Sequence, residues 1–147
     1  MSLIMTVMRL QLAMNVSNLD EAIDFYSRMF GAQPAKVKPG YANWAIENPP
    51  LKLVLFEAPG EGGTINHLGV ETETATEVVE AEARLSETGL ATTGVDDTVC
   101  CYAEKTETWV HAPDDLRWEW YVKTGEADQL VNSVVGAHEG DGPVCCG

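Results

Sequence analysis

The chain opens with an alternating stretch followed by a helical one. Apolar and polar residues alternate along Arg9–Val16, which is the period-two pattern of a half-buried strand. Apolar residues then recur at helical spacing along Leu19–Phe30. Ser17 and Asn18 are candidate N-cap residues, and Gly31 is the natural stop of this helix. The pattern therefore predicts a strand and then a helix.

Three further runs with strand character complete the first half of the chain. The turn signals Pro39-Gly40 and Pro49-Pro50 separate them. The runs predicted as strands are Ala35–Lys38, Tyr41–Glu47 and Leu51–Glu57. The first half of the chain is thus predicted to have the order β-α-β-β-β.

After a Gly-rich acidic linker at 58–64, the same order of elements returns. Asn66–Glu71 is predicted to be a strand, and Thr74–Thr88 a helix that stops at Gly89, while 94–98 has the character of a loop. The later strand candidates are Leu90–Thr93, either Cys101–Lys105 or Thr108–Ala112, and Trp118–Val122, with Ala112–Asp115 as the final turn. At one fixed offset the two halves align Gln11 with His67, Ile23 with Val79, and Met29 with Leu85. Such self-similarity indicates an internal repeat.

The repeat predicts an α+β fold in which two βαβββ modules form a curved mixed sheet around a metal cleft. We expect a single domain over 1–147, with module one at about 9–57 and module two at about 65–123. The remainder, 124–147, is rich in Gly and acidic residues and contains cysteines. We expect this tail to be flexible.

Composition and charge narrow the classes of partner. The 147 residues are 45% hydrophobic and 22% charged, which is typical of one globular domain. The net charge of −14 repels phosphate backbones and anionic lipid, so we expect neither nucleic acid nor membrane as a partner. The sequence shows neither a membrane-spanning apolar run nor a secretory signal, which predicts a cytoplasmic protein, and a homodimer is compatible with it.

Two polar residues at equivalent strand positions, and a third in the closing strand, form a candidate metal site. Gln11 and His67 align in the repeat, and Glu119 lies in the closing strand between two tryptophans. An imidazole, a carboxylate and an amide oxygen suit Fe(II), Mn(II), Ni(II) or Zn(II) and leave positions open for a substrate. Each residue alone is more often structural, so the case rests on the three together.

The sequence alone does not fix the number of side chains that would bind the metal. One alignment of the two modules pairs Glu57 with Glu119 and gives a fourth ligand, whereas another puts Leu55 there and leaves three. His111 and His138 are weaker candidates, which we interpret as surface residues.

The four cysteines form two adjacent pairs, Cys100-Cys101 and Cys145-Cys146. Adjacent side chains of an extended strand point to opposite faces, but a pair at the end of a loop can bring both sulfurs together. Two thiolates would saturate a monosubstituted trivalent arsenical, which has two exchangeable positions, and cadmium is a competing soft acceptor. The alternative is one buried and one exposed cysteine with no joint role. The terminal pair is either an auxiliary thiol arm or a tail without a fixed partner.

Several segments resemble the glyoxalase/bleomycin-resistance/dioxygenase proteins of the vicinal oxygen chelate superfamily. The segments are 11–19 with 22–26 at the start of the first module, 66–70 at the start of the second, and 113–119 at the closing turn. That turn usually carries Gly where this chain has Asp115. Within the superfamily, segments 35–46, 49–55 and 97–103 and the terminal Cys pair resemble the carbon–arsenic lyases and the related cadmium-induced proteins.

This resemblance implies a function and roles for named residues. It implies Gln11, His67 and Glu119 as Fe(II) ligands, and Cys100 and Cys101 as arsenic-binding thiols on a mobile loop. The implied reaction is dioxygen-dependent cleavage of the carbon–arsenic bond in trivalent organoarsenicals. Two alternatives remain at this stage. One is a binding protein that sequesters cadmium or arsenic without catalysis, and the other is a glyoxalase-type lyase or extradiol dioxygenase on the same fold.

Overall fold

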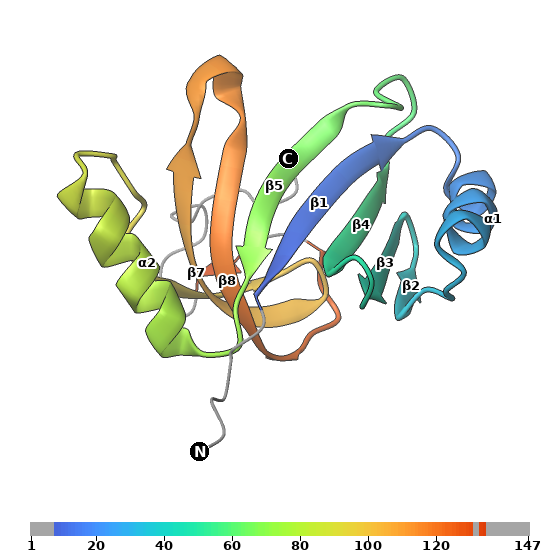
Figure 1. Ribbon diagram of the computed structural model, residues 1–147. Helices are drawn as coiled ribbons and strands as arrows, with labels where there is room; N and C mark the ends of the chain where they lie inside the picture. The colour runs from blue at the N-terminus through green and yellow to red at the C-terminus, as the bar shows by residue number, and fades with distance from the viewer. Residues whose placement is uncertain (1–7, 131–132, 135–147) are drawn as a thin grey trace. The chain divides into compact units, whose positions relative to one another are not determined.

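The computed structural model describes residues 8–130 and 133–134. Its secondary-structure elements follow the predicted order closely (Figure 1). They are β1 (Arg9–Val16), α1 (Leu19–Phe30), β2 (Lys36–Lys38), β3 (Tyr41–Ile46), β4 (Leu51–Glu57), β5 (Ile65–Glu71), α2 (Ala75–Glu87), β6 (Asp96–Cys100), β7 (Ala103–His111), the 3-10 turn η1 (Pro113–Asp115), β8 (Arg117–Glu126) and β9 (Ser133–Val134). The α+β class and the two-module repeat are confirmed. The chain divides into two compact units, an N-terminal unit of residues 9–68 and a C-terminal unit that begins at Gly69.

The N-terminal unit is a mixed sheet with one helix. Strand β1 pairs in parallel with β4, and β4 and β2 both pair antiparallel with β3. Helix α1 begins where the Asn18 side chain accepts a hydrogen bond from the Glu21 amide, and it ends at Gly31, whose φ is +62°. Both ends agree with the predicted start and stop, because Asn is a favoured N-cap and Gly tolerates the left-handed conformation.

The two faces of this sheet differ in chemistry. On one face, a cluster of buried apolar residues packs with α1, and its members are Leu19, Ala42, Trp44, Ile46, Leu53 and Leu55. On the other face, β1 presents Gln11, Ala13 and Asn15, all of them buried. Because successive side chains in a strand point to opposite faces, Gln11 is turned away from the apolar cluster. Buried polar residues are uncommon in proteins, so this face is a candidate functional surface.

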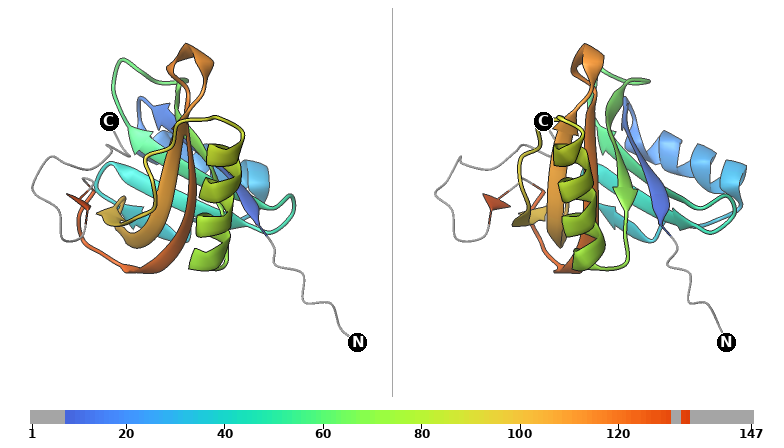
Figure 2. Two further views of the ribbon diagram at one scale, coloured as in Figure 1. Left: turned by 90° about the vertical axis from the view of Figure 1, so that its left-hand side faces the viewer. Right: turned by 60° about the vertical axis from the view of Figure 1, so that its left-hand side comes forward.

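The C-terminal unit is an antiparallel ladder with helix α2 packed on it. Strand β7 pairs with β6 on one side and with β8 on the other, and β6 also pairs with β9. Helix α2 lies along β7 and β8, as Figure 2 shows, and buries Val78, Ala81 and Leu85. Thr74 and Glu77 form a reciprocal capping box at its start.

Several predicted boundaries in the second module are wrong. The expected strand Leu90–Thr93 is only an isolated bridge between Thr92 and Val110, and the stretch 94–98, predicted as a loop, includes the first half of strand β6. The alternatives Cys101–Lys105 and Thr108–Ala112 are both replaced by one strand, β7.

The closing strand and the tail also differ from the prediction. Strand β8 continues to Glu126, so the expected tail from 124 starts too early, and β9 follows within it. Among the described residues, neither helix is long and apolar enough to cross a membrane.

Candidate metal and thiol sites

Gln11 and His67 come together in the N-terminal unit as the repeat predicts. Each is the third residue of its strand, β1 or β5, and the two side chains are 4% and 1% exposed. The Gln11 amide nitrogen lies 2.9 Å from His67 Nε2. A backbone hydrogen bond from the Asn15 amide to the Thr64 carbonyl joins the end of β1 to the residue before β5. The pairing of the strands therefore brings the two side chains together.

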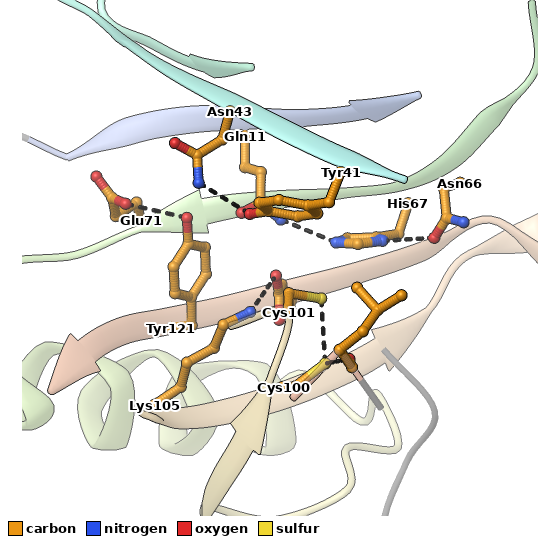
Figure 3. A network of polar contacts seen from close by, with 12 residues as sticks. Gln11, Tyr41, Asn43, Asn66, His67, Glu71, Cys100, Cys101, Lys105 and Tyr121 are labelled. Atoms are coloured by element: carbon orange, nitrogen blue, oxygen red, sulfur yellow. Dashed lines mark hydrogen bonds and ion pairs between the residues drawn. The ribbon is translucent and has the colours of Figure 1, made fainter. Parts of the chain in front are cut away.

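A chain of amide side chains fixes the imidazole of His67 (Figure 3). His67 Nδ1 lies 2.8 Å from Asn66 Oδ1, which can only accept, so Nδ1 carries the proton. Asn66 Nδ2 donates to Asn15 Oδ1, and Asn15 Nδ2 donates to the Thr64 hydroxyl. His67 Nε2 then holds its lone pair and accepts from the Gln11 amide. Histidine ligands of metals are held in this way, with the far nitrogen free for the ion.

Aromatic rings support the same imidazole from the side. The ring of Phe56 lies 6.2 Å from that of His67, and Tyr41 lies 5.5 Å from Phe56 in an edge contact. The Tyr41 hydroxyl accepts a hydrogen bond from Asn43 Nδ2 at 2.9 Å. The polar face of the N-terminal unit thus combines buried amides and one imidazole with the aromatic rings of Tyr41 and Phe56, a mixed lining that favours ligand binding.

Glu57 has a different role from the one that a fourth metal ligand would need. Its carboxylate accepts a hydrogen bond of 2.8 Å from the Leu19 amide at the start of α1. In the β1–β4 register Glu57 pairs with Val16, and Gln11 pairs with Lys52. Residues that pair across strands share a face, so Glu57 lies on the helix-covered face and Gln11 on the opposite one. This geometry favours three protein ligands.

Glu119 lies in the C-terminal unit, on a sheet face that it shares with the first thiol. It is fully buried on β8 and pairs with Trp109 on β7. Lys105 lies on the same strand as Trp109 and pairs with Thr98 of β6, two residues before Cys100. Alternation along each strand and direct pairing across them put Cys100, Lys105 and Glu119 on one face.

A buried group of charges surrounds Glu119. Lys105 Nζ is 3.6 Å from Glu119 Oε1 and 4.8 Å from the centre of the Tyr121 ring. The pKa of Glu107 is raised to about 8. Burial is the largest cause and the negative charge of Glu119 the second, while the positive charge of Lys105 acts in the opposite direction. Glu107 is therefore a neutral acid at neutral pH, which leaves one carboxylate facing one ammonium. The Tyr121 hydroxyl donates to Glu71 at 3.1 Å.

Cys100 and Cys101 have their sulfur atoms in contact. Cys100 ends β6, Cys101 begins the turn to β7, and both are buried. The sulfurs are 3.2 Å apart, too far for a disulfide bond between the two, which is about 2.05 Å long, and neither cysteine is free in the structure. Neither sulfur points away from the other, although Cys100 ends a strand where a loop was expected (Figure 3). Two adjacent sulfurs can reach one soft acceptor.

Other sequence candidates lie elsewhere. His111 is exposed at the end of β7, as expected of a surface residue. His138 and the Cys145-Cys146 pair lie outside the described residues. Within residues 8–130 and 133–134, no three His, Cys, Asp or Glu side chains gather as a metal site, and the candidate set instead includes the amide of Gln11.

Sequence reasoning did not single out four residues that shape these sites: Asn66, Lys105, Glu107 and Tyr121. Asn66 precedes a candidate ligand and could have been found by asking what would orient that imidazole. Lys105 and Glu107 could have been found as charged residues at inward positions, but only with β7 correctly assigned.

Comparisons with known proteins agree with this architecture. The model of the glyoxalase/bleomycin resistance protein/dioxygenase superfamily matches residues 9–119. A trivalent organoarsenical cleaving enzyme from Thermomonospora curvata is 50% identical over 94% of this chain and 87% of its own length. The cadmium-induced protein CadI of Mycobacterium bovis is 48% identical over 94% of this chain and 92% of its own.

Solved structures show the same fold at low sequence identity. A variant of homoprotocatechuate 2,3-dioxygenase from Brevibacterium fuscum has a TM-score of 0.60 at 19% identity and covers 85% of this chain and 34% of that one. The Mn(II)-bound glyoxalase from Novosphingobium aromaticivorans has a TM-score of 0.56 at 14% identity, over 84% of this chain and 44% of that one. At these identities the likeness concerns the fold alone.

The raised pKa of Glu107 predicts a pH-dependent stability. Between its ordinary pKa of 4.5 and about 8, folded protein keeps a proton that the unfolded chain has released, so stability falls as pH rises through this window. Glu107→Gln should reduce this fall in the metal-free protein. Denaturant unfolding at a series of pH values measures it, with the exposed Glu104→Gln as the control on the same strand. Equal slopes for Glu107→Gln and wild type would contradict the assignment.

Proposed function

Because the chain belongs to the glyoxalase/bleomycin resistance protein/dioxygenase superfamily, we propose that it cleaves the carbon–arsenic bond of trivalent organoarsenicals with Fe(II) and dioxygen. The observation that carries the proposal is the contact between two sulfurs at one end of the sheet face on which Glu119 lies. The 50% identical relative named for organoarsenical cleavage supports the same reaction class.

In the proposed site, Gln11, His67 and Glu119 hold the metal. The set offers an amide oxygen, an imidazole nitrogen and a carboxylate, which suit Fe(II) and also Mn(II), Ni(II) or Zn(II). His67 Nε2 already presents its lone pair, and rotation of the Gln11 amide would present its oxygen at the same place. The buried charge of Glu119 needs a cation, a role that Lys105 fills without metal. Fe(II), when bound, supplies the activation of dioxygen.

Cys100 and Cys101 bind the substrate in this proposal, after a small-molecule thiol has reduced them, because neither is free in the structure. A monosubstituted trivalent arsenical carries two hydroxyl groups in water. Each thiol replaces one hydroxyl, an arsenic–sulfur bond forms, and the thiol proton leaves with the hydroxide as water. Arsenic keeps its oxidation state and its carbon bond in this step. Cys100 and Cys101 would thereby hold the arsenic and fix the orientation of the organic group, which is the positioning that catalysis requires.

A sequestration protein is the second candidate. The observation that favours it is the burial of both thiols, together with the 48% identical relative named as cadmium-induced. Such a protein would bind cadmium or an arsenical tightly and release no product. It would depend on Cys100 and Cys101 and gain nothing from Gln11 or His67.

Product analysis separates the two functions. Fe(II)-loaded protein is incubated with methylarsenite in air and the arsenic species are separated. We expect inorganic arsenite, which should be absent without iron or without dioxygen. The Cys100→Ser/Cys101→Ser variant should lose this turnover, whereas Cys145→Ser/Cys146→Ser is the matched control for thiol number. Unchanged methylarsenite bound to the protein would favour sequestration, and turnover at the wild-type rate by the first variant would exclude the thiol role.

The orientation of His67 gives a separate prediction on metal binding. Asn66→Ala removes the acceptor for Nδ1–H and frees the tautomer, so iron affinity should fall by about 10- to 100-fold. Asn66→Asp keeps an acceptor and should retain most of the affinity. Anaerobic Fe(II) titration measures both. If Asn66→Ala bound Fe(II) as tightly as wild type, His67 would not be a ligand held in this way.

A further inference from the structure

Lys105 is a buried lysine on the same sheet face as one proposed metal ligand. It is 6% exposed and lies on β7, which pairs with β6 on one side and with β8 on the other. A lysine is seldom buried to this degree unless it is paired with an opposite charge. Here the fully buried Glu119 carboxylate lies 3.6 Å from Lys105 Nζ. The ammonium therefore compensates the charge of Glu119 in the metal-free protein.

The neighbouring charged groups act less strongly on Glu119 than Lys105 does. The raised pKa of Glu107 keeps this carboxyl neutral at neutral pH, so it adds no charge of its own. Arg117, two residues before Glu119 on β8, lies over the Trp109 ring at 5.3 Å and is half-buried. Because water screens a half-buried charge more than a buried one, the ammonium of Lys105 acts on Glu119 with less screening than the guanidinium does.

A second contact gives the ammonium a place beside the carboxylate. Lys105 Nζ lies 4.8 Å from the centre of the Tyr121 ring, which is within the range of a cation–π interaction (Figure 3). The Tyr121 hydroxyl donates to the Glu71 carboxylate at 3.1 Å and so fixes the ring. The ammonium can therefore shift from Glu119 toward the ring while the cation–π interaction is kept.

A divalent ion on Glu119 would reverse the effect of the Lys105 charge. A carboxylate that binds a metal directs its negative charge at the ion, and the ammonium beside it then faces two further positive charges. In a buried site such repulsion is only weakly screened. The contact that stabilises the metal-free protein is therefore unfavourable once the metal is bound.

We propose that Lys105 is an internal competitor for the metal, which stabilises Glu119 in the metal-free protein and lowers the affinity of the site for divalent ions. The inference rests on the proposed function, since it takes Glu119 as a ligand. Lys105 acts through Glu119 and is therefore a positioning residue. One cation displaces another in this exchange, and no covalent bond forms or breaks.

Anaerobic titration with Fe(II) alone, in competition with a coloured chelator, tests the inference on the full chain. Lys105→Met removes the charge and keeps a long unbranched side chain, so Fe(II) should bind about tenfold more tightly or better. Lys105→Arg keeps the charge and should keep the wild-type affinity. Lys123→Met is the matched control, because Lys123 pairs with Lys105 across β7 and β8 but is exposed, and its loss should leave the affinity unchanged.

Denaturant unfolding gives a second readout. Metal-free Lys105→Met should unfold at a lower denaturant concentration than wild type, because breaking a buried ion pair leaves a buried charge behind. Saturating Fe(II) should raise the unfolding midpoint of Lys105→Met by more than that of wild type, because a ligand that binds more tightly stabilises more. If Lys105→Met does not fold without metal, Lys105→Gln, which can still donate to Glu119, carries the same two expectations.

The possible outcomes separate this inference from the proposed function. Unchanged or weaker Fe(II) binding in the neutral variants would overturn the competitor role and leave Lys105 a structural residue. Tighter binding in Lys105→Arg as well would also overturn it, since packing and not charge would then be responsible. If Glu119→Gln bound Fe(II) as tightly as wild type, Glu119 would be no ligand, and the proposed function itself would fail.

Discussion

Burial of the Glu119 carboxylate constrains the charged side chains around it in the C-terminal unit. Glu119 is fully buried on β8, and a charged group without water needs a partner of opposite sign. Lys105 supplies the opposite charge at 3.6 Å. Glu107 adds no second negative charge at neutral pH, because its pKa is raised to about 8. The register of β6, β7 and β8 is what allows this, since it lines up the three side chains on one face. That face ends at Cys100, so the charge site and the thiols are built by the same ladder.

In the N-terminal unit, a chain of hydrogen bonds orients the imidazole of His67. His67 Nδ1–H is held by Asn66, which Asn15 and Thr64 hold in turn. The lone pair on Nε2 is thereby aimed at the position of the Gln11 amide. The opposite face of this sheet carries the apolar cluster under α1, which includes Trp44 and Leu53. Stability and chemistry are thus divided between two faces of one sheet, as alternation along a strand permits.

The sequence predicted correctly those helices and strands whose hydrophobic pattern matches the way they are buried in the fold. Strand β1 was predicted to the residue because it alternates cleanly, and helix α1 was predicted between the N-cap candidates Ser17 and Asn18 and the stop at Gly31. The offset between Gln11 and His67 also identified two side chains that the structure brings together.

Prediction failed where charged residues interrupt the usual hydrophobic pattern of a strand. Asp96 and Asp97 lower strand propensity, yet pairing with β7 makes this segment a strand. Lys105 and Glu107 place charges at inward positions and so hid the continuity of β7. Glu57 could not be assigned from spacing, because its role depends on which face of β4 it occupies. Asp115 stands where Gly is usual, and the structure explains this with a positive φ of +59°, which Asp tolerates.

The proposed function depends most directly on how arsenic is bound before any carbon–arsenic bond is broken. X-ray absorption at the arsenic edge of anaerobic Fe(II)-loaded protein with methylarsenite, in the Cys145→Ser/Cys146→Ser background, reports its neighbours. We expect two sulfur neighbours and one carbon neighbour, and loss of both sulfurs in Cys100→Ser/Cys101→Ser. Oxygen neighbours in place of sulfur in the parent protein would contradict the proposed function.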